Sequence, residues 1–242
     1  MQPYTYLIIN FLSIIICFVY SFSSKIQFNK QFPAFFKAAI VVAIPFIAWD
    51  AWFTAKGVWW FNSSYTIGQI FWGLPLEEWL FFFCIPFACV FTYYCLSRSF
   101  NLSWANAFNN LIVFAGCIIC IVVALSHPGK LYTLVTALAA TNTLIYMHFI
   151  ARREWIGEVS LVYTILMLGF FPVNGVLTGL GLEAPIVNYN PAEILNIRLL
   201  TIPIEDTVYG YTQFLWLIYF FNLFRKDVKK NNIATLSPSQ DV

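Results

Sequence analysis

The sequence predicts an all-α, polytopic membrane protein whose seven transmembrane helices form two parallel three-helix repeats joined by one connecting helix. Three observations support this fold class. Hydrophobic residues make up 60% of the 242 residues and charged residues only 10%, whereas a soluble domain carries about 25% charged residues. Apolar runs long enough to cross a bilayer recur along the chain. A proline followed by two acids opens two of these runs.

Seven apolar runs define the expected helices. Each has roughly the 20 residues that a transmembrane helix needs. The first run has no basic residue before it and no small-residue cleavage site after it, so we expect a retained helix rather than a signal peptide. In chain order the runs are Tyr4–Phe22, Phe35–Thr54, Leu76–Leu96, Phe108–Ser126, Leu131–Ile150, Ile156–Leu177 and Ile204–Phe224.

The basic residues predict how the bundle is oriented. Most of them fall in alternate loops and in the tail, on one side of the expected bundle: Lys25, Lys30, Lys37, Arg98, Arg152, Arg153, Arg225, Lys226, Lys229 and Lys230. The other side carries Lys56, Lys130 and Arg198. Because basic loops stay in the cytoplasm, we expect an integral protein of a bacterial cell membrane with its N-terminus outside and its C-terminus inside.

An internal repeat organises the chain. Pro75-Leu76-Glu77-Glu78 opens the third run, and Pro203-Ile204-Glu205-Asp206 opens the last run 128 positions later. Upstream, Asp50 precedes Gly57 by seven positions, as Asn174 precedes Gly181. A directly duplicated unit of three helices would emerge inverted, and one extra crossing restores the parallel orientation. We therefore expect a first repeat (1–100), a connecting helix (101–129), a second repeat (130–226) and a disordered cytoplasmic tail (227–242).

Five acids in or near the membrane are the candidate catalytic residues. An ionised acid deep in a bilayer costs at least about 2.5–3.5 kcal/mol, so such residues usually have a function. A proline with acids in the first turn is also a common way to begin a helix. The chain has few charged residues, yet two of its helices begin with the same paired acids. This repetition favours a functional role for the acids over a role in helix initiation alone. The candidates are Glu77, Glu205, Glu78, Asp206 and Asp50, with Glu77 and Glu205 first because the two repeats agree there in side-chain length.

Aromatic side chains are the second indication of a functional site. Six of the nine tryptophans lie in a stretch of 31 residues: Trp49, Trp52, Trp59, Trp60, Trp72 and Trp79. They are typical either of an interfacial belt or of electron-rich walls around a site where positive charge develops. Further candidates for binding are Tyr209, which shares a helix face with Glu205, and Asn174. Arg198 either pairs with Asp206 or Glu205 or marks the membrane interface.

Other chemistry has no support in the sequence. It contains no glycine-rich nucleotide loop and no cluster of metal ligands, so we expect neither a cofactor nor a bound metal. The six cysteines all fall in apolar runs and are expected to be buried hydrophobic residues rather than disulfide partners. A net charge of +2 gives no reason to expect nucleic acid as a partner.

The doubled proline–acid motif, together with Trp49-Asp50, resembles the membrane-integral lycopene cyclases in their fused form, over nearly the whole chain up to about Phe224. One departure is Asn174, which stands where the first repeat has Asp50. The resemblance implies a lycopene β-cyclase, an isomerase of the intramolecular lyase type. A carboxylic acid protonates the terminal double bond of lycopene, the cation closes a ring, and a proton leaves. The substrate is a carotenoid dissolved in the bilayer, and no cofactor is needed.

Two other classes of protein fit the helix pattern less well. Small transporters of the three-plus-one-plus-three plan carry Pro-Gln pairs, and this sequence has none. A retinal-binding protein needs a lysine in the last helix, and Ile204–Phe224 has none. The residues leave open the ring type, whether one or both ends are closed, and the number of copies that assemble.

Overall fold

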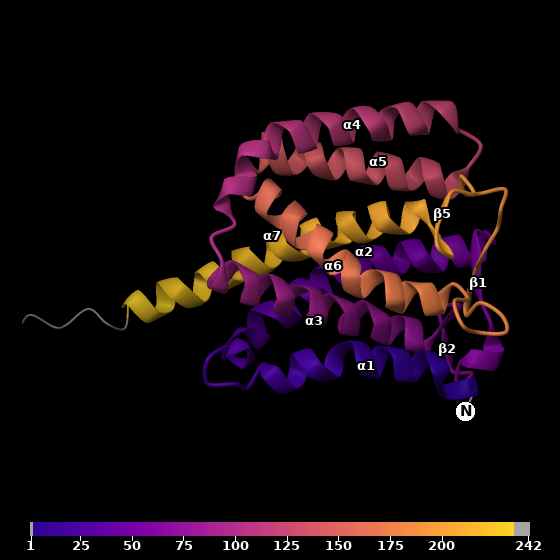
Figure 1. Ribbon diagram of the computed structural model, residues 1–242, viewed down its shortest axis with the longest axis horizontal. Helices are drawn as coiled ribbons and strands as arrows, with labels where there is room; N and C mark the ends of the chain where they lie inside the picture. Colours follow the sequence, from indigo (N-terminus) through magenta and orange to yellow (C-terminus); the bar gives the residue numbers. More distant parts are fainter. Residues whose placement is uncertain (1, 235–242) are drawn as a thin grey trace, which may run out of the picture.

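Seven long helices form one bundle in the computed structural model, which describes residues 2–234 (Figure 1). The all-α fold class is confirmed, and the helix bounds lie close to the apolar runs. The helices are α1 (Thr5–Tyr20), α2 (Phe32–Ala55), α3 (Leu76–Ser99), α4 (Asn109–Ser126), α5 (Leu131–Ile145), α6 (Ile156–Leu177) and α7 (Ile204–Ala234). A five-residue π-helix, η5 (Tyr146–Ile150), continues α5 to the predicted end of its apolar run.

The first six of these helices are long and apolar enough to cross a membrane, which makes this an integral membrane protein. Helix α7 is less apolar because it carries Glu205, Asp206, Gln213 and Asn222. It packs against α2 and α5 inside the bundle, so its polar groups are shielded by the other helices. Helix α7 runs to Ala234, which places residues 227–234 of the expected tail in a helix; the rest of that tail lies outside the described residues.

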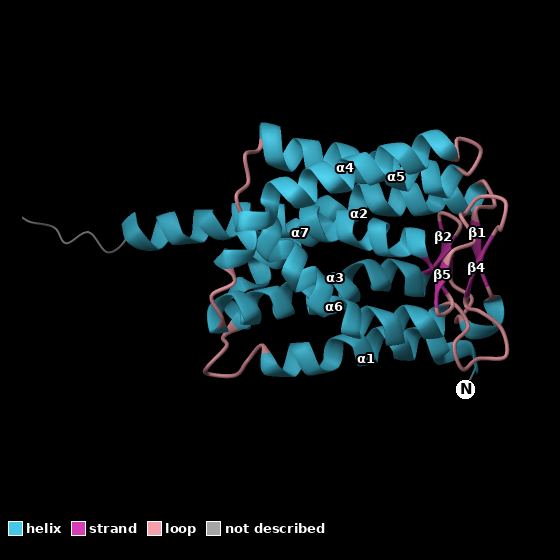
Figure 2. Ribbon diagram, turned by 45° about the horizontal axis from the view of Figure 1, so that its top comes forward, coloured by secondary structure: helices cyan, strands magenta, loops and turns pink. Residues whose placement is uncertain are grey.

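All the strands lie at one end of the bundle, as Figure 2 shows. Two hairpins sit at equivalent places in the repeats, just before α3 and α7. The first joins β2 (Ile70–Phe71) to β3 (Leu74–Pro75), and the second joins β5 (Arg198–Leu199) to β6 (Ile202–Pro203). Their tip residues Trp72 and Leu200 both adopt a left-handed backbone, with φ of 54° and 60°. The two repeats therefore share even their irregular backbone.

The remaining two strands join the repeats to each other. Strand β1 (Trp59–Phe61) pairs antiparallel with β4 (Val187–Tyr189), and Trp60 lies opposite Asn188 at the centre of the ribbon. Asn188 is also the residue that lies 128 positions after Trp60. Because the central pair consists of equivalent residues, the contact is the kind that a twofold axis produces. A twofold axis relating the repeats would pass through the middle of this ribbon.

The two proline–acid motifs begin α3 and α7 at the end of the bundle that carries the strands, and both helices run from there in the same direction (Figure 1). The crossing added by α4 is what makes the second repeat parallel to the first. Toward the other end, buried apolar residues from α2, α3, α6 and α7 form the largest core cluster, including Phe35, Phe87, Val162 and Phe221. This end carries none of the five candidate acids.

Replacing Gly157 with Ala should lower the stability of the protein. A Cβ at Gly157 would overlap the carbonyl oxygen of Ala105, where the start of α6 meets the short helix η4 (Ser103–Phe108). Overpacking of this kind costs about 1–3 kcal/mol. Gly169 lies in the same helix with nothing within 4 Å of its added Cβ, so Gly169→Ala is the matched control. Thermal unfolding in detergent should show a lower midpoint for Gly157→Ala only; equal midpoints would contradict the packing.

Candidate functional site

A cavity between α3, α6 and α7 is lined by equivalent faces of the two repeats. Helix α3 contributes Glu78, Phe81, Phe82, Ile85, Pro86 and Cys89, and α7 contributes Asp206, Tyr209, Gly210, Gln213, Phe214 and Leu217. Each of these α7 residues lies 128 positions after its α3 counterpart. The spacing of three and four residues puts each set on one face of its helix. The cavity is thus a shared product of both repeats rather than a pocket within one of them.

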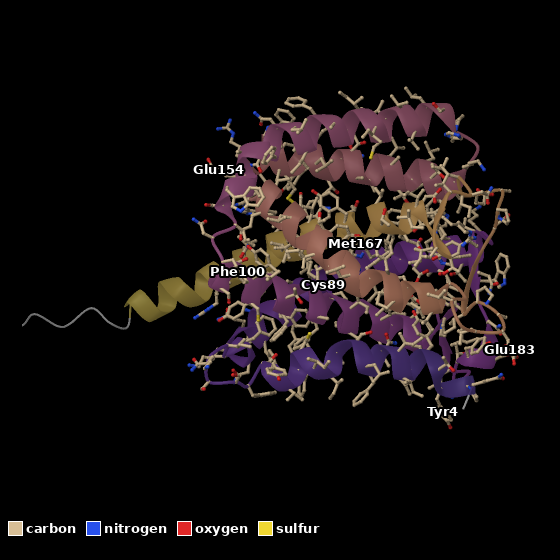
Figure 3. All side chains as sticks on the ribbon, viewed as in Figure 1. Tyr4, Cys89, Phe100, Glu154, Met167 and Glu183 are labelled. Carbon is tan, nitrogen blue, oxygen red and sulfur yellow. The ribbon has the colours of Figure 1, made fainter. Side chains whose placement is uncertain are left out.

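The cavity reaches from the strand end to the middle of the bundle. Cys89 lies eleven positions after Glu78, which is about 16 Å along a helix. Figure 3 shows Cys89 about midway between the end marked by Tyr4 and Glu183 and the end marked by Phe100 and Glu154. The ribbon contributes Trp59, Phe61, Val187 and Tyr189 to the wall, and α6 contributes Tyr163, Phe170, Asn174, Leu177 and Thr178. Acids therefore sit at one end of an otherwise largely aromatic and apolar space.

The second acid of each pair faces the cavity and accepts a hydrogen bond from a tyrosine of the first helix of its repeat. The Tyr6 hydroxyl donates to Oε2 of Glu78 over 2.5 Å, and the Tyr132 hydroxyl donates to Oδ1 of Asp206 over 2.7 Å. Both tyrosines also line the cavity. Asp206 receives a further bond over 2.8 Å, from the Tyr189 hydroxyl to Oδ2.

The first acid of each pair is turned away from the cavity and holds the preceding loop. Oε1 of Glu77 accepts from the backbone N–H of Ile67, and Oε1 of Glu205 accepts from that of Leu195, both over 2.7 Å. Each donor lies ten positions before its acid. Glu205 also accepts from the Thr133 hydroxyl over 2.6 Å. Both acids are buried, and the geometry favours Glu78 and Asp206 over them as groups that meet a substrate.

Asp50 joins the cavity from α2. Its Oδ1 accepts from the indole N–H of Trp59 over 2.6 Å, and Asp50 and Glu78 both line the cavity. Asn174, at the matching place in the second repeat, also lines the cavity, and its amide donates to the carbonyl oxygen of Phe170 over 3.3 Å. The cavity thus brings together three of the five candidate acids.

Most of the candidate aromatic residues lie away from the cavity. Of the six tryptophans, all of which the structure describes, Trp59 lines it. Trp49 packs on Tyr209 behind the wall, with 4.9 Å between ring centroids. The Trp79 indole donates to the carbonyl oxygen of Phe71 over 3.2 Å. The exposed side chains of Trp52, Trp60 and Trp72 fit an interfacial belt.

Arg198 does not pair with either acid that the sequence suggested for it. Its side chain is exposed, and its guanidinium group donates to the carbonyl oxygen of Thr201. The guanidinium carbon lies 5.9 Å from the centre of the Tyr189 ring. The hydrogen bonds of Asp206 and Glu205 come instead from hydroxyl groups and a backbone amide.

Sequence reasoning missed three tyrosines that touch the acids. Tyr6 and Tyr132 lie 126 positions apart, close to the repeat spacing, so an alignment of the first helices of the two repeats could have found them. Tyr189 comes from β4, and no comparable signal marks it. Burial and the nearby carboxyl group of Asp206 raise the pKa of Tyr189 well above its ordinary value, so this hydroxyl stays protonated and acts as a donor.

Fold and cavity together define a class: a membrane-embedded protein of two three-helix repeats that share one acidic, aromatic cavity. The chain belongs to the lycopene cyclase family, because the family model described as lycopene cyclase matches residues 3–96 and 129–224. The two matched segments are the two repeats, and the unmatched stretch between them contains α4. Neither the curated proteins nor the solved structures contain a significant match. Membership in this family makes the chain a carotenoid cyclase in the broad sense.

Proposed function

We propose that this protein is a lycopene β-cyclase that closes the linear end groups of lycopene into six-membered rings. One observation carries the proposal: the carboxyl groups of Asp50, Glu78 and Asp206 gather at one end of a cavity whose other walls are largely aromatic and apolar. Such a cavity fits an apolar end group and offers acid and base groups to it. The reaction belongs to the isomerases, as an intramolecular lyase step.

The chemistry needs only proton transfer. A carboxylic acid adds a proton to the terminal double bond, which leaves a tertiary cation. The next double bond attacks this cation, a carbon–carbon bond closes the ring, and the positive charge moves onto the ring. Loss of a neighbouring proton to a carboxylate gives the ring double bond. No electrons are gained or lost overall, so the proton balance closes without an oxidant or a reductant.

The cavity walls suit a reaction that passes through cations. The rings of Trp59, Phe81 and Tyr209 line the space beside the acids, and aromatic faces attract positive charge. Exclusion of water protects a cation from capture as an alcohol. The polar groups gather at one end, and the large core cluster fills the other end of the bundle. This arrangement supports an enzyme over a transporter, which would need a polar path across the membrane.

Expression in a bacterial host that accumulates lycopene tests this function. We expect the pigments of the host to shift from lycopene to carotenoids with β-rings, as judged by chromatography and absorption spectra. A host that carries the empty vector is the control. Unchanged lycopene at a verified level of folded protein would contradict the proposal, and ε-rings would correct the ring type.

We further propose that the strand end faces outward and the opposite end faces the cytoplasm, as the distribution of basic residues favours. Ser64 lies exposed at the strand end, and Ser24 lies exposed in the loop between α1 and α2. A membrane-impermeant thiol reagent should label Ser64→Cys in intact cells, and it should label Ser24→Cys only after the cells are opened. The parent chain, with its six cysteines in helices, is the control. The reverse pattern would invert the proposed topology.

A further inference from the structure

The two acids that occupy equivalent places in the cavity have different neighbours. Glu78 shares the cavity wall with a second carboxyl group from its own repeat, that of Asp50. Asp206 has no such neighbour from the matching place in the second repeat, because Asn174 stands there. It is bonded instead by two phenol groups, those of Tyr132 and Tyr189. The cavity is therefore nearly twofold symmetric in shape and asymmetric in its chemistry.

The Asp50–Glu78 pair is arranged to hold a proton. Two carboxylates in contact repel each other, and a hydrogen bond between them requires a proton on one of them. Oδ2 of Asp50 is buried and has no hydrogen-bond partner among the residues that the structure describes. A proton shared with Glu78 would satisfy this oxygen, and buried polar atoms in native proteins nearly always have a partner. The pair can thus supply one proton to the cavity.

Both carboxyl oxygens of Asp206 act as hydrogen-bond acceptors. Each of its oxygens accepts one hydrogen bond from a phenol, over 2.7 Å from Tyr132 and 2.8 Å from Tyr189. Phenols that donate to a carboxylate make strong, charge-assisted bonds. Both donors leave the remaining lone pairs of Asp206 free for the cavity. A group of this kind can act as the countercharge of a cation and then as its base.

We propose that the two sides of the cavity divide the reaction: the Asp50–Glu78 pair donates the proton that starts ring closure, and Asp206 accepts the proton that ends it. This division rests on the proposed cyclase function. Tyr132 and Tyr189 are positioning residues, which hold the base in place. Asn174 keeps the second side from holding a shared proton, so each side has one role.

The proton balance closes over one turnover. The pair loses a proton to the terminal carbon–carbon double bond, where it becomes part of a carbon–hydrogen bond. Ring closure forms one carbon–carbon bond. Asp206 then takes a proton from a carbon next to the ring cation, and the electron pair of that carbon–hydrogen bond forms the ring double bond. Return of the proton from Asp206 to the pair restores the starting state, with no net change in charge.

Isotope exchange distinguishes the two roles. Purified parent protein, Glu78→Gln and Asp206→Asn are incubated with lycopene in liposomes made in heavy water, and both product and recovered lycopene are analysed by mass spectrometry. With the parent, each new ring should carry deuterium from the donor pair. With Glu78→Gln, ring formation should fall at least about 100-fold, and the recovered lycopene should carry no deuterium, because no cation forms.

Asp206→Asn should behave differently. Ring formation should again fall at least about 100-fold, but the recovered lycopene should gain deuterium, because the cation forms and loses a proton back to the donor pair. The same labelling with Glu78→Gln, or its absence with both variants, would overturn the division of roles. If the parent itself forms no ring, the proposed cyclase function fails, which is a distinct result.

If Asp206→Asn fails to fold, Tyr189→Phe provides a second test of the role of Asp206. Removal of one hydrogen bond to a charged group should slow ring formation about 10-fold and raise the ratio of labelled lycopene to product. If Tyr189 has a purely structural role, the labelled lycopene and the ring product should fall together and their ratio should not change. That result would overturn the assignment of Tyr189. Tyr211→Phe is the matched control, because the Tyr211 hydroxyl contacts Ser160 outside the cavity wall; its ratio should equal that of the parent.

Discussion

Replacement of Glu78 by Gln, or of Asp206 by Asn, should lower the rate of ring closure at least about 100-fold, the low end of the contribution of a general acid or base. The amide keeps the shape of the side chain and can still accept a bond from its tyrosine, but it cannot exchange a proton of useful acidity. Both carboxyl groups line the cavity. The measurement is the initial rate of ring formation by purified protein in liposomes, at equal folded yield.

The neighbouring acid supplies the control for this prediction. Glu77→Gln makes the same chemical change one position earlier, at a buried carboxyl group that contacts a loop amide. It should keep most of the parent rate, because the Gln oxygen can accept from Ile67 as the Glu oxygen does. If Glu77→Gln loses activity and Glu78→Gln keeps it, the first acid of each pair is the proton donor, as the agreement of Glu77 with Glu205 in length suggested.

Replacement of Glu205 by Ala should destabilise the protein by about 2 kcal/mol or more. It leaves the backbone N–H of Leu195 and the hydroxyl of Thr133 without their acceptor, and a buried donor without a partner costs about 1–3 kcal/mol. Thermal unfolding in detergent should show the loss as a lower midpoint. Glu205→Gln keeps an acceptor oxygen and should lie near the parent.

An exposed acid provides the comparison for Glu205. Glu183 lies at the same end of the bundle with its side chain in contact with solvent, so Glu183→Ala should leave the midpoint unchanged. If Glu205→Ala unfolds at the same midpoint as the parent, the loop before α7 does not depend on this carboxyl group.

The helix bounds could be predicted closely from the sequence, because the length of each apolar run and the helix-breaking residues beside it determine where a helix begins and ends. The run Ile156–Leu177 is the whole of α6, and the proline–acid motifs begin α3 and α7 where expected. Helix α2 starts earlier than its apolar run, at Phe32, with Pro33 in its first turn, a position that proline favours. Such features are properties of neighbouring residues, which a single sequence displays.

The choice between adjacent acids was harder to predict because it depends on distant partners. Residues i and i+1 point about 100° apart on a helix, and either acid of a pair could face the interior. Tyr6 lies 72 positions from Glu78, and Tyr132 lies 74 positions from Asp206. No local pattern contains these contacts. The repeat spacing relates the two pairs to each other, but it does not say which member of each pair meets the cavity.

The register of the β1–β4 ribbon has a consequence for the origin of the chain. Trp60 and Asn188 pair at its centre and occupy the same place in their repeats, so a lone three-helix unit with a strand like β1 could pair in this register with its own copy. A homodimer of such units would be joined along this ribbon, and duplication followed by fusion would keep the same seam within one chain. In such a dimer both acids of the cavity would have had identical surroundings. Fusion lets each half change alone, and Asp50 against Asn174 is one of the places where the two halves now differ chemically.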